Sequence, residues 1–108
     1  MMTLPSDFEW VKEMYDDAYY PDFLVDKVKE ALVPVAAFIG EGGHSLEEIQ
    51  GSLDEAIGRI NGLQDEFWDN DSDIETVARE SIGATVEAML AALGVDIDTE
   101  TAIRERDW

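Results

Sequence analysis

The chain has 108 residues, of which 45% are hydrophobic, and it contains no cysteine. This length fits one domain over residues 1–108 with its own apolar core, and the lack of cysteine excludes disulfide bonds and thiolate metal sites. The 26 acidic and 7 basic residues give a formal net charge of −19. Such a charge repels phosphate backbones and anionic lipids, so nucleic-acid binding and membrane-surface binding are not expected.

The chain start carries no targeting signal that we recognise. The first ten residues are acidic and lack the apolar run of a signal peptide. Nowhere does an apolar run reach the ~20 residues that span a bilayer. We therefore expect a cytoplasmic protein.

A first helix is predicted from Ser6 to about Asp17. Ser6 and Glu9 have the spacing of a capping box, in which each residue's side chain satisfies a backbone N–H of the other. A turn over 18–21 follows, because Pro21 disfavours helical geometry at the residue before it. The apolar residues at helical spacing are Phe8, Val11, Met14 and Tyr15.

A second helix is predicted from Pro21 to about Ile39. Its apolar stripe is broad, and Pro34 falls inside it. Because proline lacks an N–H and clashes with the preceding turn, we expect a kink or a break there. The glycines that should end the helix and form a flexible loop are Gly40, Gly42 and Gly43.

The third predicted helix covers 45–67. Ser45 and Glu48 form a capping box, and a narrow apolar seam follows with spacings of three and four residues. The seam packs either within the fold or across a homodimer, so the chain is a monomer or a homodimer. The seam consists of Leu46, Ile49, Leu53, Ala56, Ile60, Leu63 and Phe67. Three glycines lie off the seam: Gly51, Gly58 and Gly62. We interpret their cost to helix stability as tolerated, and do not take them to mark a second face on which another element packs closely.

The fourth predicted helix runs from about Asp73 to Leu93, with a capping box formed by Ser72 and Glu75 and a C-terminal cap at Gly94. A short last helix is predicted over 99–106. No alternating strand pattern or internal repeat is present. The predicted fold is therefore all-α, a compact bundle of about four main helices with a short C-terminal helix.

Residues 69–80 resemble a calcium loop in spacing, because oxygen-bearing side chains recur where that ion needs ligands. The candidate ligands are Asp69, Asp71, Asp73, Glu75 and Glu80. However, Ile74 stands where the loop needs a glycine. A helix start at Ser72 explains the segment better, so no metal or other cofactor is expected.

His44 is the sole histidine. As a general base it would need a positioned partner and a pocket, and the sequence shows neither. As the residue before the cap at Ser45, it can pack on Ile49 or face water. An enzyme that uses His44 is accordingly the weakest functional hypothesis, and no catalytic residue is assigned.

Two acidic, aromatic segments suggest a binding surface for a basic protein. Between Glu30 and Ala78 there are twelve acids and one base, Arg59. Aromatic anchors beside carboxylates suit the recognition of Lys and Arg. The alternative is that these aromatics close the end of the bundle. The candidate residues are Tyr15, Asp16, Asp17, Tyr19, Tyr20, Asp65, Glu66 and Trp68.

Four segments resemble a family of small acidic bacterial proteins of unknown function: 19–21, 23–27, 43–49 and the ending 104–108. The resemblance covers nearly the whole chain and implies a bacterial source, but no activity. By analogy of size, charge and helicity alone, toxin-neutralising immunity proteins are similar. The sequence therefore favours a non-enzymatic module that binds a basic partner, with a homo-oligomer through 45–67 as the alternative.

Overall fold

The computed structural model describes residues 3–108, and this part of the chain is helical without strands. This confirms the all-α prediction. None of its helices is both long and apolar enough to cross a lipid bilayer. The helices are α1 (Lys12–Tyr15), α2 (Asp22–Glu41), α3 (Leu46–Asn61), α4 (Gln64–Asp69), α5 (Thr76–Ala92) and α6 (Thr99–Ala102).

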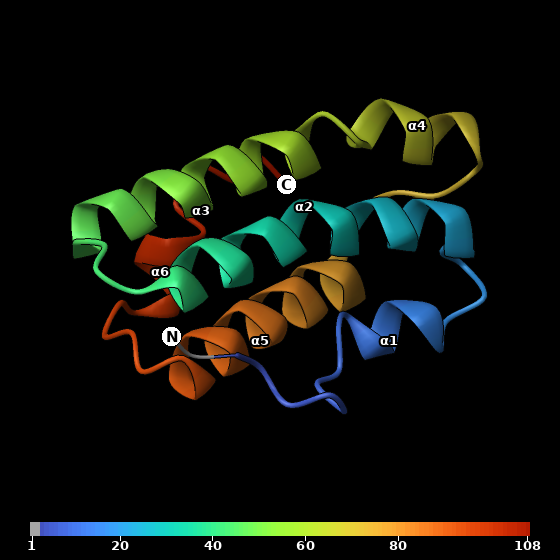
Figure 1. Ribbon diagram of the computed structural model, residues 1–108. Helices are drawn as coiled ribbons and strands as arrows, with labels where there is room; N and C mark the ends of the chain where they lie inside the picture. The colour runs from blue at the N-terminus through green and yellow to red at the C-terminus, as the bar shows by residue number, and fades with distance from the viewer. Residues whose placement is uncertain (1–2) are drawn as a thin grey trace.

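Helix α3 packs antiparallel against α2, and in the view of Figure 1 α2 runs between α3 and α5. The short α1 packs against α5 and α2, and α6 packs against α3 and α5. The side chains that α2 buries are Leu24, Val25, Val28, Ala31, Leu32, Val35 and Ile39. Removal of this apolar surface from water is the main force that assembles the bundle.

Pro34 does not break α2, which is continuous from Asp22 to Glu41. Of the predicted kink or break, the break is therefore wrong. Pro34 lies on the exposed side of the helix, as does Glu30, whose carbonyl loses its helical donor. Water can reach this exposed side, so the lost hydrogen bond need not interrupt the helix.

The capping box at the start of α3 is confirmed. The Glu48 N–H donates to Ser45 Oγ at 3.1 Å, and the Ser45 N–H donates to Glu48 Oε1 at 2.8 Å. The predicted single helix over 45–67 is divided, however, because α3 ends at Asn61 and α4 begins at Gln64. At the junction, the Leu63 N–H turns to the carbonyl of Ile60 rather than continuing the α-helical pattern.

The apolar seam of α3 faces α2 within the same chain. Its central members Ile49, Leu53, Ala56 and Ile60 are buried, whereas Leu46 at its start is 53% exposed. The interior seam residues therefore present no free face for a second copy. Around Gly51 and Gly58 a β-carbon would meet open space, so these glycines are tolerated rather than required for close packing.

The first helix is much shorter than predicted. Residues 6–7 form a turn, and α1 begins only after Val11, which adopts a left-handed backbone conformation with φ 42°. This conformation is costly for a β-branched residue. It is compensated because the Val11 side chain is fully buried and its N–H donates to Thr85 Oγ1 of α5 at 3.0 Å. The predicted capping box of Ser6 and Glu9 is therefore wrong.

Replacing Thr85 by valine should lower the free energy of unfolding by about 1–3 kcal/mol, because it leaves the buried Val11 N–H without an acceptor. Denaturant unfolding followed by circular dichroism measures the change. Thr85→Ser is the matched control, since it keeps the hydroxyl, and it should remain closer to the wild-type value. A Thr85→Val protein as stable as the wild type would contradict this role.

The end of α5 follows the sequence pattern. Gly94 has φ 70°, and the N–H of Val95 reaches back to the carbonyl of Leu90 at 2.9 Å, which is the hydrogen bond of a Schellman motif. The start of α5 does not follow the pattern: Thr76 is its first residue, and Glu75 at the N-cap makes no side-chain capping bond. The predicted capping box of Ser72 and Glu75 is therefore wrong.

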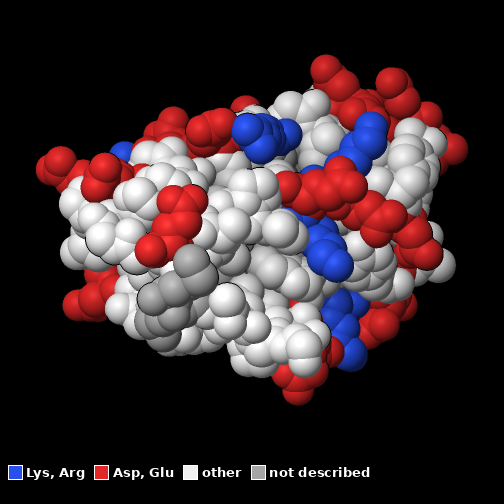
Figure 2. Space-filling model, in the orientation of Figure 1, with Lys and Arg blue, Asp and Glu red and all other residues white. Residues whose placement is uncertain are grey.

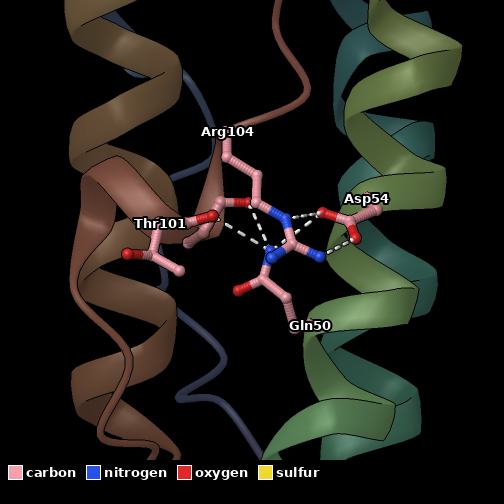
Figure 3. Close-up of polar contacts among 5 residues, drawn as sticks. Gln50, Asp54, Thr101 and Arg104 are labelled. Atoms are coloured by element: carbon pink, nitrogen blue, oxygen red, sulfur yellow. Dashed lines mark hydrogen bonds and ion pairs between the residues drawn. The ribbon is translucent and has the colours of Figure 1, made fainter.

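The C-terminal segment 98–108 lies along α3 as a strap (Figure 3). Its first contact is Gln50 of α3, whose Nε2 donates to the carbonyl of Thr101 at 3.0 Å. Arg104 then binds the carboxylate of Asp54 through Nη2 at 2.6 Å and Nε at 3.2 Å. Farther along α3, Asn61 Nδ2 donates to the carbonyl of Glu105 at 2.7 Å.

The Arg104 guanidinium, with help from Gln50, holds the pKa of Asp54 below its ordinary value of 3.8. Because the pKa of Asp54 is lower in the folded than in the unfolded state, the stabilisation from its pair with Arg104 is present at neutral pH. It is lost as the pH falls through the folded-state pKa of Asp54. Arg104→Met should therefore lower the free energy of unfolding at pH 7, by the small amount typical of a solvent-exposed ion pair. This difference from the wild type should shrink as the pH falls below 3.8.

Unfolding titrations of both proteins at several pH values test this expectation. Arg106→Met serves as the control, because Arg106 makes a single 3.4 Å contact with the exposed Glu100. An Arg104→Met penalty that is equal at low and neutral pH would show that Arg104 stabilises the strap through packing rather than through charge.

Candidate protein-binding surface

Tyr20 connects three segments at one end of the bundle. It is 3% exposed, and its phenol oxygen accepts a hydrogen bond from the N–H of Ala78 in the first turn of α5 at 3.2 Å. Its ring meets the buried Phe67 of α4 edge-on, with 6.3 Å between ring centroids. Tyr20 thus supplies to α5 the acceptor that the predicted capping box does not provide.

The turn before α2 presents Tyr19 on the outer side of Tyr20. The two rings meet edge-on at 5.1 Å between centroids, and the Tyr19 N–H is held by Asp17 Oδ1 at 2.9 Å. Partial burial and the nearby carboxylates of Glu75 and Asp73 raise the pKa of the Tyr19 phenol. The tyrosine turn and the acidic loop 70–75 therefore lie together, although about fifty residues separate them in the sequence.

Four large apolar side chains are exposed on the segments that Tyr20 joins, namely the turn before α2, the first turn of α2, α4 and the first turn of α5. Seven acidic residues come from the same segments, and Figure 2 shows acidic side chains at this end, with Lys and Arg side chains among them, and along the edge formed by α3. We call this surface the acidic-aromatic end. Its apolar members are Tyr19, Phe23, Trp68 and Val77, and its acidic members are Asp17, Asp22, Asp65, Asp69, Asp71, Asp73 and Glu75.

Most of the charge at the acidic-aromatic end is not neutralised by the chain itself. Within residues 3–108, none of its seven carboxylates has a Lys, Arg or His nitrogen within 4.0 Å. The bases nearby bind elsewhere: Lys27 binds Glu66 at 2.6 Å, and Arg79 donates to Thr76 Oγ1 at 3.2 Å. This leaves carboxylates beside exposed aromatic rings, an arrangement that can accept cationic side chains.

The structure divides the predicted binding residues into two groups. Tyr15, Asp16, Tyr20 and Glu66 are engaged within the chain. The Tyr15 hydroxyl donates to Asp26 at 2.5 Å, and burial, together with this bond, raises the pKa of Tyr15. Lys12 binds Asp16 at 3.0 Å. The residues that remain on the acidic-aromatic end are Asp17, Tyr19, Asp65 and Trp68.

Sequence reasoning missed Phe23 and Val77 as surface residues. Phe23 is 51% exposed on α2, although it fits the apolar stripe of that helix. Val77 lies in the first turn of α5 and is 41% exposed, although its helical spacing from Ile74 predicts an inward position. Phe23 closely follows the acidic, tyrosine-rich turn before α2, and this position could have indicated that it is exposed. Helical spacing alone, however, assigns Phe23 to the core.

The calcium-loop candidates do not form a loop of the required kind. The chain is already helical from Thr76, so Glu80 lies on α5 and not at the end of a loop. Within residues 3–108, no three His, Cys, Asp or Glu side chains are grouped closely enough to hold a metal ion. Asp73 instead accepts the N–H of Ile74 at 2.8 Å, and Asp71 adopts φ 57° in the turn after α4.

His44 stacks on Phe38 of α2, with 3.7 Å between ring centroids and 10° between ring planes. Its Nε2 lies 3.4 Å from a carboxylate oxygen of Glu41, and its Nδ1 lies 4.0 Å from one of Glu48. His44 therefore packs on Phe38 at the loop between α2 and α3, a contact that neither sequence alternative, packing on Ile49 or facing water, included. The loop between α2 and α3, which carries His44, lies at the opposite end of the bundle from the turn before α2 and from α4 (Figure 1).

Comparison with known families gives one match, to a family of unknown function, DUF5713, over residues 5–108. The chain belongs to this family. The predicted resemblance to a family without known function is thereby confirmed, and membership supplies no activity. No curated protein and no solved structure matches the chain.

Tyr20→Phe should lower the free energy of unfolding by about 1–3 kcal/mol, since it leaves the Ala78 N–H buried without an acceptor. Tyr19→Phe is the matched control, because it deletes the same hydroxyl from an exposed ring and should cost less than about 0.5 kcal/mol. Thermal and denaturant unfolding measure both variants. Equal stabilities of the two variants would contradict the bridging role of Tyr20.

Proposed function

We propose that this protein is a non-enzymatic binding module that recognises a basic protein surface through its acidic-aromatic end. The observation that carries the proposal is the coincidence of four exposed apolar side chains with seven carboxylates that lack a described basic partner. Neither feature alone would distinguish a binding site from a solvated surface.

In this proposal, the net charge of the protein and the burial of its exposed aromatic rings contribute to binding in different ways. The net charge of −19 attracts a basic partner over a distance and raises its association rate at low salt. The exposed rings then provide the apolar contact that fixes the complex, since aromatic residues dominate binding hot spots. Tyr19 is held against the buried Tyr20, so it presents its surface with little loss of conformational freedom on binding.

Nuclear magnetic resonance tests where a basic partner binds. We expect a dodecapeptide of alternating Lys and Arg, added to ¹⁵N-labelled protein at low salt, to shift the amide signals of residues 15–23 and 64–78 most strongly. The shifts should diminish as salt is added, because screening weakens charge-based attraction. Equal shifts along α3 and the solvent side of α5 would show diffuse attraction to acids and would contradict the proposal.

Charge reversal provides the matched comparison. The double variant Asp65→Lys/Asp69→Lys alters exposed positions on α4 and should weaken peptide binding by roughly three- to tenfold. Glu47→Lys/Glu87→Lys changes the net charge by the same amount at exposed positions outside the acidic-aromatic end. If both double variants lose the same affinity, net charge and not the site determines binding.

A further inference from the structure

We propose that the acidic-aromatic end selects arginine-rich over lysine-rich segments, with the indole of Trp68 as the surface on which a guanidinium group stacks. This inference rests on the proposed function, since it names the chemistry of the partner at the same surface. Trp68 is 54% exposed, whereas its neighbour Phe67 is fully buried and supplies the core contact of α4. The indole is therefore free for a partner.

The position of Trp68 next to carboxylates gives it a cation-binding environment. Asp65 lies three residues earlier on α4, so its side chain shares a face of the helix with Trp68. The Asp71 N–H donates to the Trp68 carbonyl at 3.2 Å, which places a second acidic residue one turn beyond. Asp65 and Asp71 are both exposed.

Arginine fits such a surface better than lysine does. Its guanidinium is planar, so it can stack on an indole face while its N–H groups bind a carboxylate at the edge. The ammonium group of lysine is a compact and strongly hydrated charge, and it gains less from an exposed ring. An acidic surface without aromatic rings would attract both residues by charge alone.

Helix α4 holds the indole in a defined position despite its short length. The Ser72 N–H closes the helix end on the Phe67 carbonyl at 2.8 Å, and Asn70 Nδ2 donates to the Glu66 carbonyl at 2.8 Å. The side chain of Glu66 is in turn bound by Lys27 of α2 at 2.6 Å. With α4 fixed in this way, stacking on Trp68 requires little ordering of the backbone.

The test uses two labelled peptides of equal length and charge, each with six Arg or six Lys separated by glycine and serine, titrated by fluorescence anisotropy at low salt. We expect the wild type to bind the arginine peptide roughly two- to fivefold more tightly. Trp68→Ala should weaken arginine binding by about the same factor and make the two peptides equal. Trp68→Phe keeps an aromatic face and should retain part of the preference.

Leu46→Ala is the matched control, because Leu46 is 53% exposed at the opposite end of the bundle, and its removal should leave the preference unchanged. Circular dichroism verifies that each variant is folded. If the wild type binds both peptides equally, or if Trp68→Ala keeps the preference, the arginine inference is overturned while the proposed function stands. If neither peptide binds at low salt, the proposed function itself fails.

Discussion

The hydrogen bond between Tyr20 and the N–H of Ala78 is the constraint on which the arrangement of the acidic-aromatic end depends. A buried backbone donor at a helix start needs an acceptor, and the local sequence of α5 does not supply one. The acceptor comes from a turn far earlier in the chain, so the turn must lie against α5. Because the same ring packs on Phe67, α4 is brought to this end as well.

The acidity of the chain has several physical roles. Glu48 caps α3, Asp54 fixes the C-terminal strap, and Asp98 accepts the N–H of Thr101 at the start of α6. These carboxylates gain stability from their partners, and hydrogen bonding lowers the pKa of each. At the acidic-aromatic end, Asp17 and Asp73 each accept a local backbone N–H. Within residues 3–108, none of the seven carboxylates there forms an ion pair, so their mutual repulsion weakens folding. A cationic partner would relieve that repulsion on binding.

Local patterns predicted the features that local chemistry determines. The capping box of α3, the Schellman end at Gly94 and the buried faces of α2 and α3 follow from spacing and turn residues within a few positions. The starts of α1 and α5 did not, because each is determined by a contact across the fold, from Thr85 and from Tyr20 respectively. For the proposed binding surface, the sequence named Tyr19 and Trp68 as candidates, but it could not separate them from Tyr15 and Tyr20, which are engaged within the chain.

The alternation of outer and inner aromatics at this end has an evolutionary consequence. Tyr19 and Trp68 face outward, and their immediate neighbours Tyr20 and Phe67 carry the packing of the core. Under the proposed function, substitutions at the outer positions would change what is recognised while the inner pair keeps the bundle folded. Adjacent positions in the chain would thus experience different selection, and partner specificity could diverge among family members on an unchanged scaffold.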